Sequence, residues 1–207
     1  MDSRFKLYYF DARARGELIR LIFHAAGEDF EDIKVYQGMW EKLKPAMPFH
    51  TLPVLEIGEQ QLSQSLSIAR YLANIFDMAG RNNLEKALVD SAAELIDELL
   101  SDALKIIYER EHKYKARATK KFGAITLPAK MHRLEEFHSK YGKGYGYIVG
   151  NDLTYADLAA YSTFDQIVAA AIVPWEYFEQ FPYPSQLKKR ILDGEPRLSQ
   201  YFRYTNS

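Results

Sequence analysis

The residues best suited to binding chemistry lie in two adjoining segments, 50–57 and 62–72. The first is typical of a short apolar strand that opens on Pro53, and proline fits in a sheet only at a strand's first residue, an edge or a bulge. A cis Leu52-Pro53 bond would turn the chain sharply, so that the Leu52 N–H and C=O could pair with an extended peptide. A trans bond is the ordinary alternative, because only about 5% of X-Pro bonds are cis.

The second segment predicts a helix that begins at Ser65, directly after Gln64. A helix start presents unpaired N–H groups and the positive end of the helix dipole, which together suit a carboxylate. The alternative is that Ser65 only caps the helix. A segment that binds peptide backbone next to one that binds a carboxylate favours a small acidic peptide as the ligand.

Composition and histidine spacing restrict the remaining chemistry. The 207 residues include no cysteine, which excludes disulfides, thiolate metal sites and a Cys-x-x-Cys redox mechanism. Any reactive thiol must therefore arrive with the ligand. The five histidines, at 24, 50, 112, 132 and 138, form no His-x-x-x-His pair, so we expect no metal site.

Charge and hydropathy do not favour nucleic acid or a membrane as the main partner. The chain carries 27 basic and 28 acidic residues. It has no apolar run of signal-peptide or membrane-spanning length, so we expect a soluble cytoplasmic protein without membrane insertion. The stretch 112–121 carries five Lys/Arg and no acid, which would suit an anion, although a solvated helix end or loop is the commoner meaning.

Hydrophobic periodicity predicts an N-terminal α/β domain over residues 1–77. In chain order we expect a strand at 5–10, a helix at 18–26, a strand at 30–35 and an irregular or briefly helical region at 37–45. A strand pair around Gly58 and a helix from Ser65 follow. The first three elements make a βαβ unit with parallel strands. Tyr8 and Tyr9 lie on the first strand and point to opposite faces, and the residues alone do not decide which of them lines a site.

The rest of the chain predicts a linker over 78–84 and an all-helical domain over 85–207. Its helices are expected at 84–107, from Pro128 to before Gly142, and at 158–173, 185–192 and 197–204. The run Thr154-Tyr155-Ala156-Asp157 has the spacing of a helix capping box.

The runs 48–56, 64–65, 68–72 and 150–157 resemble the cytosolic glutathione transferases, with the sigma-like class most similar, and the likeness covers nearly the whole chain. The resemblance implies a thioredoxin-like βαβ-ββα domain followed by a C-terminal helical bundle. It also implies an enzyme that conjugates the glutathione thiolate to small apolar electrophiles in detoxification. Glutathione would be a co-substrate, no other cofactor is implied, and the chain would form a homodimer, with Phe49 near the dimer contact.

The resemblance also assigns individual residues. It makes Tyr9 the catalytic tyrosine and Arg15 the support of the thiolate. Glutathione would be held by Tyr9, Trp40, Lys44, His50, Thr51, Leu52, Pro53, Gln64 and Ser65, with Asp97 or Glu98 reaching the ligand of the partner subunit. The second-substrate pocket would contain Phe10, Lys105, Ala159 and Thr163.

Two other functions fit the same resemblance. One is a glutathione-dependent isomerase of the prostaglandin-synthase type, which shares the glutathione site and differs in the second pocket. The other is a non-catalytic ligand carrier on the same fold. The presence of Tyr9, Arg15 and the Gln64-Ser65 pair favours an enzyme, since a carrier would be free to lose them.

Overall fold

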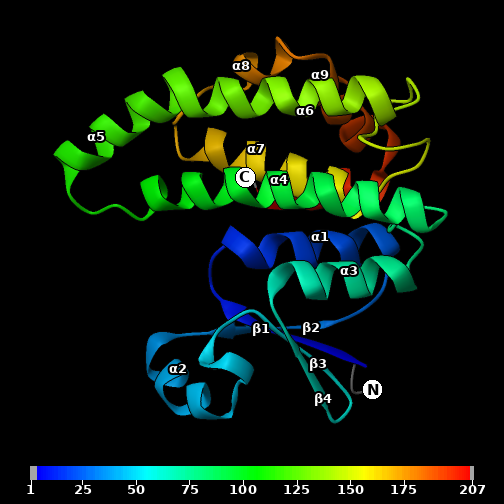
Figure 1. Ribbon diagram of the computed structural model, residues 1–207. Helices are drawn as coiled ribbons and strands as arrows, with labels where there is room; N and C mark the ends of the chain where they lie inside the picture. The colour runs from blue at the N-terminus through cyan, green and yellow to red at the C-terminus, as the bar shows by residue number, and fades with distance from the viewer. Residues whose placement is uncertain (1–3, 206–207) are drawn as a thin grey trace. The chain divides into compact units, whose positions relative to one another are not determined.

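The computed structural model describes residues 4–205, and the chain divides into two compact units (Figure 1). The first unit comprises residues 4–76 together with 195–205, and the second comprises residues 77–194.

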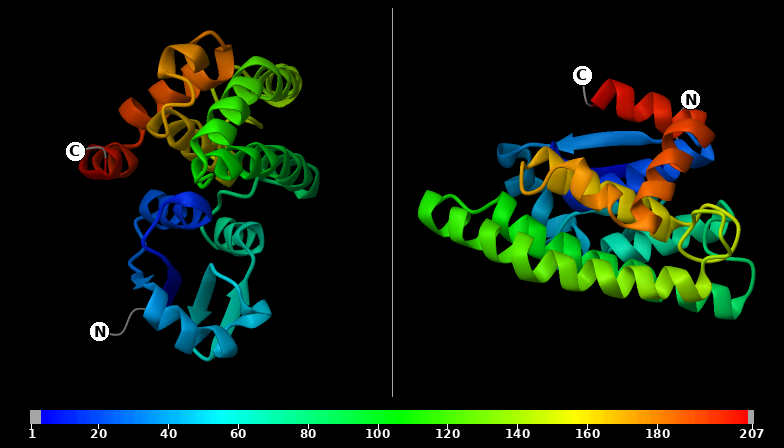
Figure 2. Two further views of the ribbon diagram at one scale, coloured as in Figure 1. Left: turned by 90° about the vertical axis from the view of Figure 1, so that its left-hand side faces the viewer. Right: turned by 90° about the horizontal axis from the view of Figure 1, so that it is seen from above.

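A four-stranded mixed sheet forms the centre of the first unit. Its strands are ordered β2-β1-β3-β4, with bounds Glu31–Val35, Phe5–Phe10, Val54–Ile57 and Gln60–Ser63. Strand β1 runs parallel to β2, as the predicted βαβ unit requires, and antiparallel to β3. Helices α1 (Glu17–Ala26) and α3 (Ser65–Ile75) pack side by side on one face of this sheet (Figures 1 and 2).

Burial alternates along β1, which fixes the face of each of its side chains. Phe5, Leu7 and Tyr9 are buried, whereas the residues between them are less buried. The Phe5 ring lies 5.3 Å from that of Phe23 on α1, and Phe23 stacks on Phe30 at 4.3 Å. Tyr9 therefore shares the face of the sheet that packs against α1.

The region after β2 is more regular than the sequence predicted. It forms helix α2 (Gln37–Leu43) and then two single 3₁₀ turns, Lys44–Ala46 and Pro48–His50. None of the α2 residues is buried. A helix without a buried face gives a weak periodic signal, which explains why the sequence indicated only a briefly helical region.

The second unit is helical in its described secondary structure. The helices α4 to α9 span Asn83–Ile107, His112–Lys121, Leu127–Tyr141, Tyr155–Ala169, Trp175–Glu179 and Pro182–Lys189. Helices α4 and α6 run side by side, and α7 packs against α4 (Figure 2). Every residue of α7 from 155 to 167 is buried, so α7 is the core helix of this unit. Short α8, which begins after Pro174, was not predicted.

The last helix, α10 (Pro196–Thr205), belongs with the first unit, although the sequence pattern placed it in the helical domain. The Tyr201 hydroxyl donates to Glu17 on α1 at 3.0 Å, and Arg197 donates to the Ala26 carbonyl at 3.0 Å. An amphipathic pattern gives the apolar face of a helix but not the surface it covers, which explains the difference. No described helix is long and apolar enough to cross a membrane.

Candidate active site

Tyr9 lies near the C-terminal end of β1, where the following turn folds back over its ring. Only 7% of Tyr9 is exposed, and its hydroxyl oxygen accepts a hydrogen bond from the Arg15 amide at 3.2 Å. Gly16 lies against the ring so closely that a Cβ atom there would be 2.3 Å from a ring carbon. A hydroxyl can accept and donate at once, so the hydrogen bond from the Arg15 amide fixes the phenol without using its O–H as donor.

Tyr8 occupies the opposite face of β1, as strand geometry predicts. Its hydroxyl donates to Glu56 of β3 at 3.3 Å. Burial, with the Glu56 carboxylate next to it, raises the pKa of Tyr8. Tyr8 is therefore a neutral donor to Glu56, which favours Tyr9 as the site tyrosine.

A buried arginine that the sequence analysis did not single out lies next to the Tyr9 ring. Arg20 is 4% exposed, and its guanidinium carbon lies 5.8 Å from the ring centroid. It donates to Asp32 at 2.9 Å, to the Ala12 carbonyl at 2.9 Å and to Glu17 at 3.3 Å. Burial opposes the charge of Arg20 but the Asp32 carboxylate favours it, and the net effect raises the pKa of Arg20. The sequence did contain a signal for this arginine, because Arg20 is the one charged residue within the otherwise apolar run 18–22.

The turn before β3 has the predicted backbone. The Leu52-Pro53 peptide bond is cis, which confirms the prediction. The strand ladder begins at Val54, which is aligned with Tyr8 of β1 and Ser63 of β4, so Leu52 lies just outside the ladder. Leu52 is half-buried, whereas Pro53 is buried.

Helix α3 begins at Ser65 without a side-chain cap from the preceding residue and without an acid in its first turn. The residue before it, Gln64, has a φ of 73°, in the left-handed region that non-glycine residues rarely adopt. Such strained conformations persist where the surrounding structure fixes them, and they cluster at ligand sites. Ser65 is buried at this helix start. The start of α3 therefore retains its positive dipole end for an incoming anion.

Helix α2 and the segment between it and β3 hold the remaining predicted glutathione contacts. The Trp40 ring meets the Phe10 ring edge-on at 5.7 Å. His50 donates from Nδ1 to the Lys44 carbonyl at 2.9 Å, so its ring orders this loop. Lys44 and Thr51 are exposed.

The site residues predicted on the helical unit lie on helices α4 and α7. Glu98 accepts from Lys130 of α6 at 2.7 Å, and Asp97 is half-buried. Lys105 is exposed and donates to Asp102 on its own helix at 2.9 Å. Ala159 and Thr163 are buried in α7. The predicted second-substrate pocket combines these residues with Phe10 of the first unit and stays a prediction.

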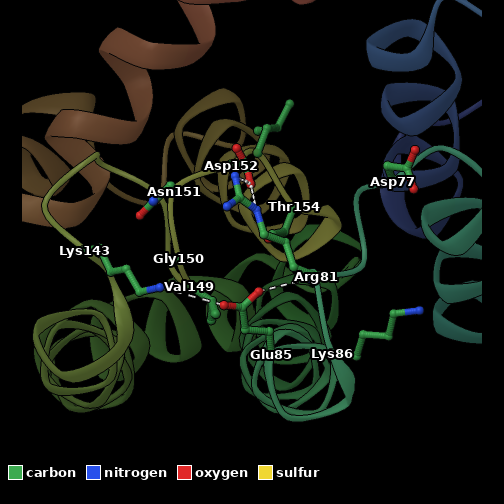
Figure 3. A pocket seen from close by; sticks show the side chains of 12 residues that line it. Asp77, Arg81, Glu85, Lys86, Lys143, Val149, Gly150, Asn151, Asp152 and Thr154 are labelled. Atoms are coloured by element: carbon green, nitrogen blue, oxygen red, sulfur yellow. Dashed lines mark hydrogen bonds and ion pairs between the residues drawn. The ribbon is translucent and has the colours of Figure 1, made fainter.

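A hollow of about 470 Å³ in the second unit contains none of the predicted site residues (Figure 3). Its charged lining residues are three cations and three anions, Arg81, Lys86, Lys143, Asp77, Glu85 and Asp152. Arg81 pairs with Asp152 at 2.6 Å, and Lys143 lies 3.8 Å from Glu85. The balanced charges join the segment after residue 77 to the loop after α6, which indicates a structural role.

A mixed four-stranded sheet with α1 and α3 on one face, followed by a separate helical unit, defines a thioredoxin-like domain with a C-terminal helical domain. Residues 5–74 match the family model of the glutathione S-transferase N-terminal domain, and residues 97–204 match a glutathione S-transferase C-terminal domain. The chain belongs to the glutathione S-transferase family.

Individual relatives agree with this assignment. Glutathione S-transferase 1 of Ascaris suum is 34% identical over 204 residues, which are 97% of this chain and 90% of that protein. Hematopoietic prostaglandin D synthase of Rattus norvegicus is 36% identical over 153 residues, or 74% of each chain. The solved structure of the Fasciola hepatica sigma class GST superposes with a TM-score of 0.86 at 28% identity, covering 98% of this chain and 96% of that one. The expected likeness to the sigma-like class is confirmed.

Proposed function

We propose that the protein binds glutathione and transfers its thiolate to small apolar electrophiles, with no cofactor besides this co-substrate. The observation that carries the proposal is the buried Tyr9 hydroxyl, held by the Arg15 amide at 3.2 Å on the face of β1 that packs against α1. A thiol bound there would meet a fixed O–H donor. The chain itself has no cysteine, so glutathione supplies the sulfur.

The free energy that this donor must supply is within reach of one hydrogen bond. A free thiol has a pKa of ~8.5, and only its thiolate is a good nucleophile. Lowering that pKa by about two units requires nearly 3 kcal/mol of preference for the anion, at about 1.36 kcal/mol per unit. A hydrogen bond to a charged group contributes about 1.5–3 kcal/mol. Tyrosine suits the role because it keeps its proton up to a pKa of ~10.

The remaining parts of the first unit would hold the peptide. The start of α3, at Gln64 and Ser65, would bind the γ-glutamyl carboxylate through its amides, its dipole and the Ser65 hydroxyl. The Leu52 backbone, just outside the strand ladder, would pair with the cysteinyl unit. Trp40 and Lys44 would hold the glycine end. Arg15 would add positive charge near the sulfur.

The assembly we propose is a cytoplasmic homodimer active in detoxification. Asp97 or Glu98 would reach the ammonium group of the partner's glutathione, and the Glu98 carboxylate also accepts from Lys130. Phe49 is 75% exposed on the loop after Pro48 and would bury its ring at the dimer contact. Light scattering at micromolar concentration should give the mass of two chains, and a monomer would contradict this assembly.

A glutathione-dependent isomerase of the prostaglandin-synthase type is the second candidate. The 36% identity to rat hematopoietic prostaglandin D synthase favours it. Both functions need the Tyr9 site, and they differ in the second substrate. Parallel assays with a chlorodinitrobenzene-type electrophile and a prostaglandin endoperoxide would separate them, and binding without turnover of either would favour a ligand carrier.

The direct test exchanges each adjacent tyrosine for phenylalanine. Tyr9→Phe should keep glutathione affinity nearly intact but lower turnover ten- to a hundredfold, about 1.4–2.7 kcal/mol of barrier. Tyr8→Phe is the matched control, because its hydroxyl donates to Glu56 on the other face. If Tyr8→Phe had the large effect and Tyr9→Phe did not, the assignment of Tyr9 would be wrong.

A further inference from the structure

The near-zero net charge of the chain conceals a strongly cationic segment. Residues 112–134 contain seven Lys/Arg and no Asp or Glu. Since the whole chain has a net charge of −1, the residues outside this segment carry −8. A charge separation of this size gives the segment its own electrostatic surface, independent of the whole-chain balance.

Helix α5 presents most of this charge to solvent. It lies at one end of the paired helices α4 and α6, and a π-helical segment, Phe122–Thr126, joins it to α6 (Figure 1). Lys113, Arg117, Lys120 and Lys121 fall at i, i+4, i+7 and i+8, which places them on one helix face, and all four are exposed. Within the described part of the chain, none of these four cationic groups forms an ion pair, and the Glu111 carboxylate accepts from the Lys113 backbone amide at 3.0 Å. We call these four residues the cationic face.

Two large apolar side chains border the cationic face. Tyr114 is 64% exposed and Ile125 is 62% exposed. The spacing 114, 121, 125 places both on the same side of the helix as Lys121. The opposite side of α5 is anchored, because Lys115 donates to the Ile107 carbonyl of α4 at 3.0 Å. The protein therefore holds this face outward on an ordered helix.

We propose that the cationic face docks the protein reversibly on a membrane surface rich in anionic lipids. A helix with basic residues on one side and exposed apolar groups at its margin binds such surfaces by combining attraction to the headgroups with shallow apolar insertion. Ile125 favours lipid over nucleic acid, because an aliphatic side chain offers no ring on which a base can stack. Docking would place a glutathione-using protein next to electrophiles dissolved in lipid, but it does not depend on the Tyr9 site.

The test is sedimentation of the full chain with vesicles of phosphatidylcholine containing about 30% phosphatidylserine, at about 0.1 M salt. Each cation near an anionic surface strengthens binding roughly fivefold, so the triple variant Lys113→Gln, Arg117→Gln, Lys120→Gln should bind about a hundredfold more weakly. About 0.5 M salt should release the wild type in the same way. Ile125→Ser should weaken binding severalfold at both salt concentrations, since the apolar contribution is not screened.

A charge-matched control distinguishes loss of the cationic face from an equal change in the net charge of the protein. The exposed lysines Lys140, Lys143 and Lys189 lie elsewhere in the same unit, and their triple exchange to Gln changes the net charge equally. This control should retain wild-type vesicle binding. Equal loss in both triple variants, or equal binding to pure phosphatidylcholine, would overturn the proposal. The proposal would also be overturned if the wild type bound a single-stranded DNA oligonucleotide but not vesicles, and the α5 triple variant lost that DNA binding.

Discussion

Helices α7 and α3 begin in opposite ways, although both starts were visible as serine or threonine motifs in the sequence. The start of α7 is closed by its own side chains. Asp157, fully buried, accepts from the Thr154 amide at 2.9 Å, from the Thr154 hydroxyl at 2.7 Å and from the Ile148 amide at 2.7 Å. Tyr183 adds a fourth bond at 3.0 Å. The start of α3 has no such cap and no acid in its first turn.

The difference teaches how a structural helix start differs from one that can bind a ligand. Thr154 and Asp157 satisfy the α7 start internally, so its amides contribute to stability. At α3, Gln64 is held at a φ of 73° and its side chain does not cap the helix, so the helix start can bind an external carboxylate. Mutations at the two starts should therefore separate stability from binding.

The largest effect is expected at the start of α7, where Asp157 is buried and accepts four hydrogen bonds. Asp157→Asn replaces a carboxylate that accepts four hydrogen bonds with an amide whose nitrogen cannot accept any, leaving buried donors unpaired. We expect the free energy of unfolding in urea to fall by about 2–3 kcal/mol. Asp152→Asn is the matched control, because Asp152 is exposed and its ion pair with Arg81 should be worth less than about 1 kcal/mol. Similar losses of unfolding free energy in both variants would contradict the role of the Thr154–Asp157 capping box.

The same variant carries a pH signature. Burial raises the pKa of Asp157 from 3.8 to about 6, despite the hydrogen bonds that oppose the shift. The folded protein thus holds this proton more tightly than the unfolded chain, so the contribution of Asp157 to stability grows as pH falls from above 6 toward 3.8. The difference in unfolding free energy between wild type and Asp157→Asn should be larger at pH 5 than at pH 7.5. The opposite trend would show that the hydrogen bonds outweigh burial.

The next effect concerns the candidate catalytic residue Tyr9. Gly16→Ala places a Cβ atom where the Tyr9 ring now lies, so the ring must move. A displacement of about 1 Å at a reacting group can lower turnover by about a hundredfold. Glutathione affinity should change little. Gly38→Ala, at a glycine with no atom within 4 Å of the added carbon, should keep full turnover. Full turnover in Gly16→Ala would mean that the ring position does not matter.

The smallest effect is expected at the start of α3, which has no side-chain cap. Ser65→Ala should weaken glutathione binding about tenfold, about 1.4 kcal/mol, because one hydrogen bond to a carboxylate is lost. Stability should remain within about 0.5 kcal/mol of wild type, since α3 begins without a side-chain cap that this exchange could remove. Ser67→Ala, at an exposed residue of the same helix, should leave both quantities unchanged. Lost stability without lost affinity would make Ser65 a structural residue.

Elements with strong local signals were predictable from the sequence. The alternating pattern of β1, the helical spacing of α1 and α4, and the Thr154–Asp157 box each depend on a few neighbouring residues. Tertiary placement was not predictable in the same way. Helix α10 packs on α1 through Tyr201 and Glu17, a pairing 184 residues apart that no local pattern reveals.

Prediction of the candidate site from the sequence meets the same limit. The helix start at Ser65 followed from residue types, whereas residue types left the Leu52-Pro53 bond open between cis and trans. The choice between Tyr8 and Tyr9 needed the family resemblance, and the structure now supports it with the Glu56 and Arg15 contacts. The packing of Gly16 and Arg20 against the Tyr9 ring depends on the fold of the turn, so only coordinates could reveal it.

The central claim is that Tyr9 stabilises the glutathione thiolate, and the pKa of the bound thiol measures this directly. Thiolate ultraviolet absorption of the glutathione complex, titrated with pH, should give a pKa about two units below the free value of ~8.5. In Tyr9→Phe the pKa of the bound thiol should rise most of the way back to ~8.5. A wild-type complex whose thiol titrates like free glutathione, or a Tyr9→Phe complex identical to wild type, would contradict the account.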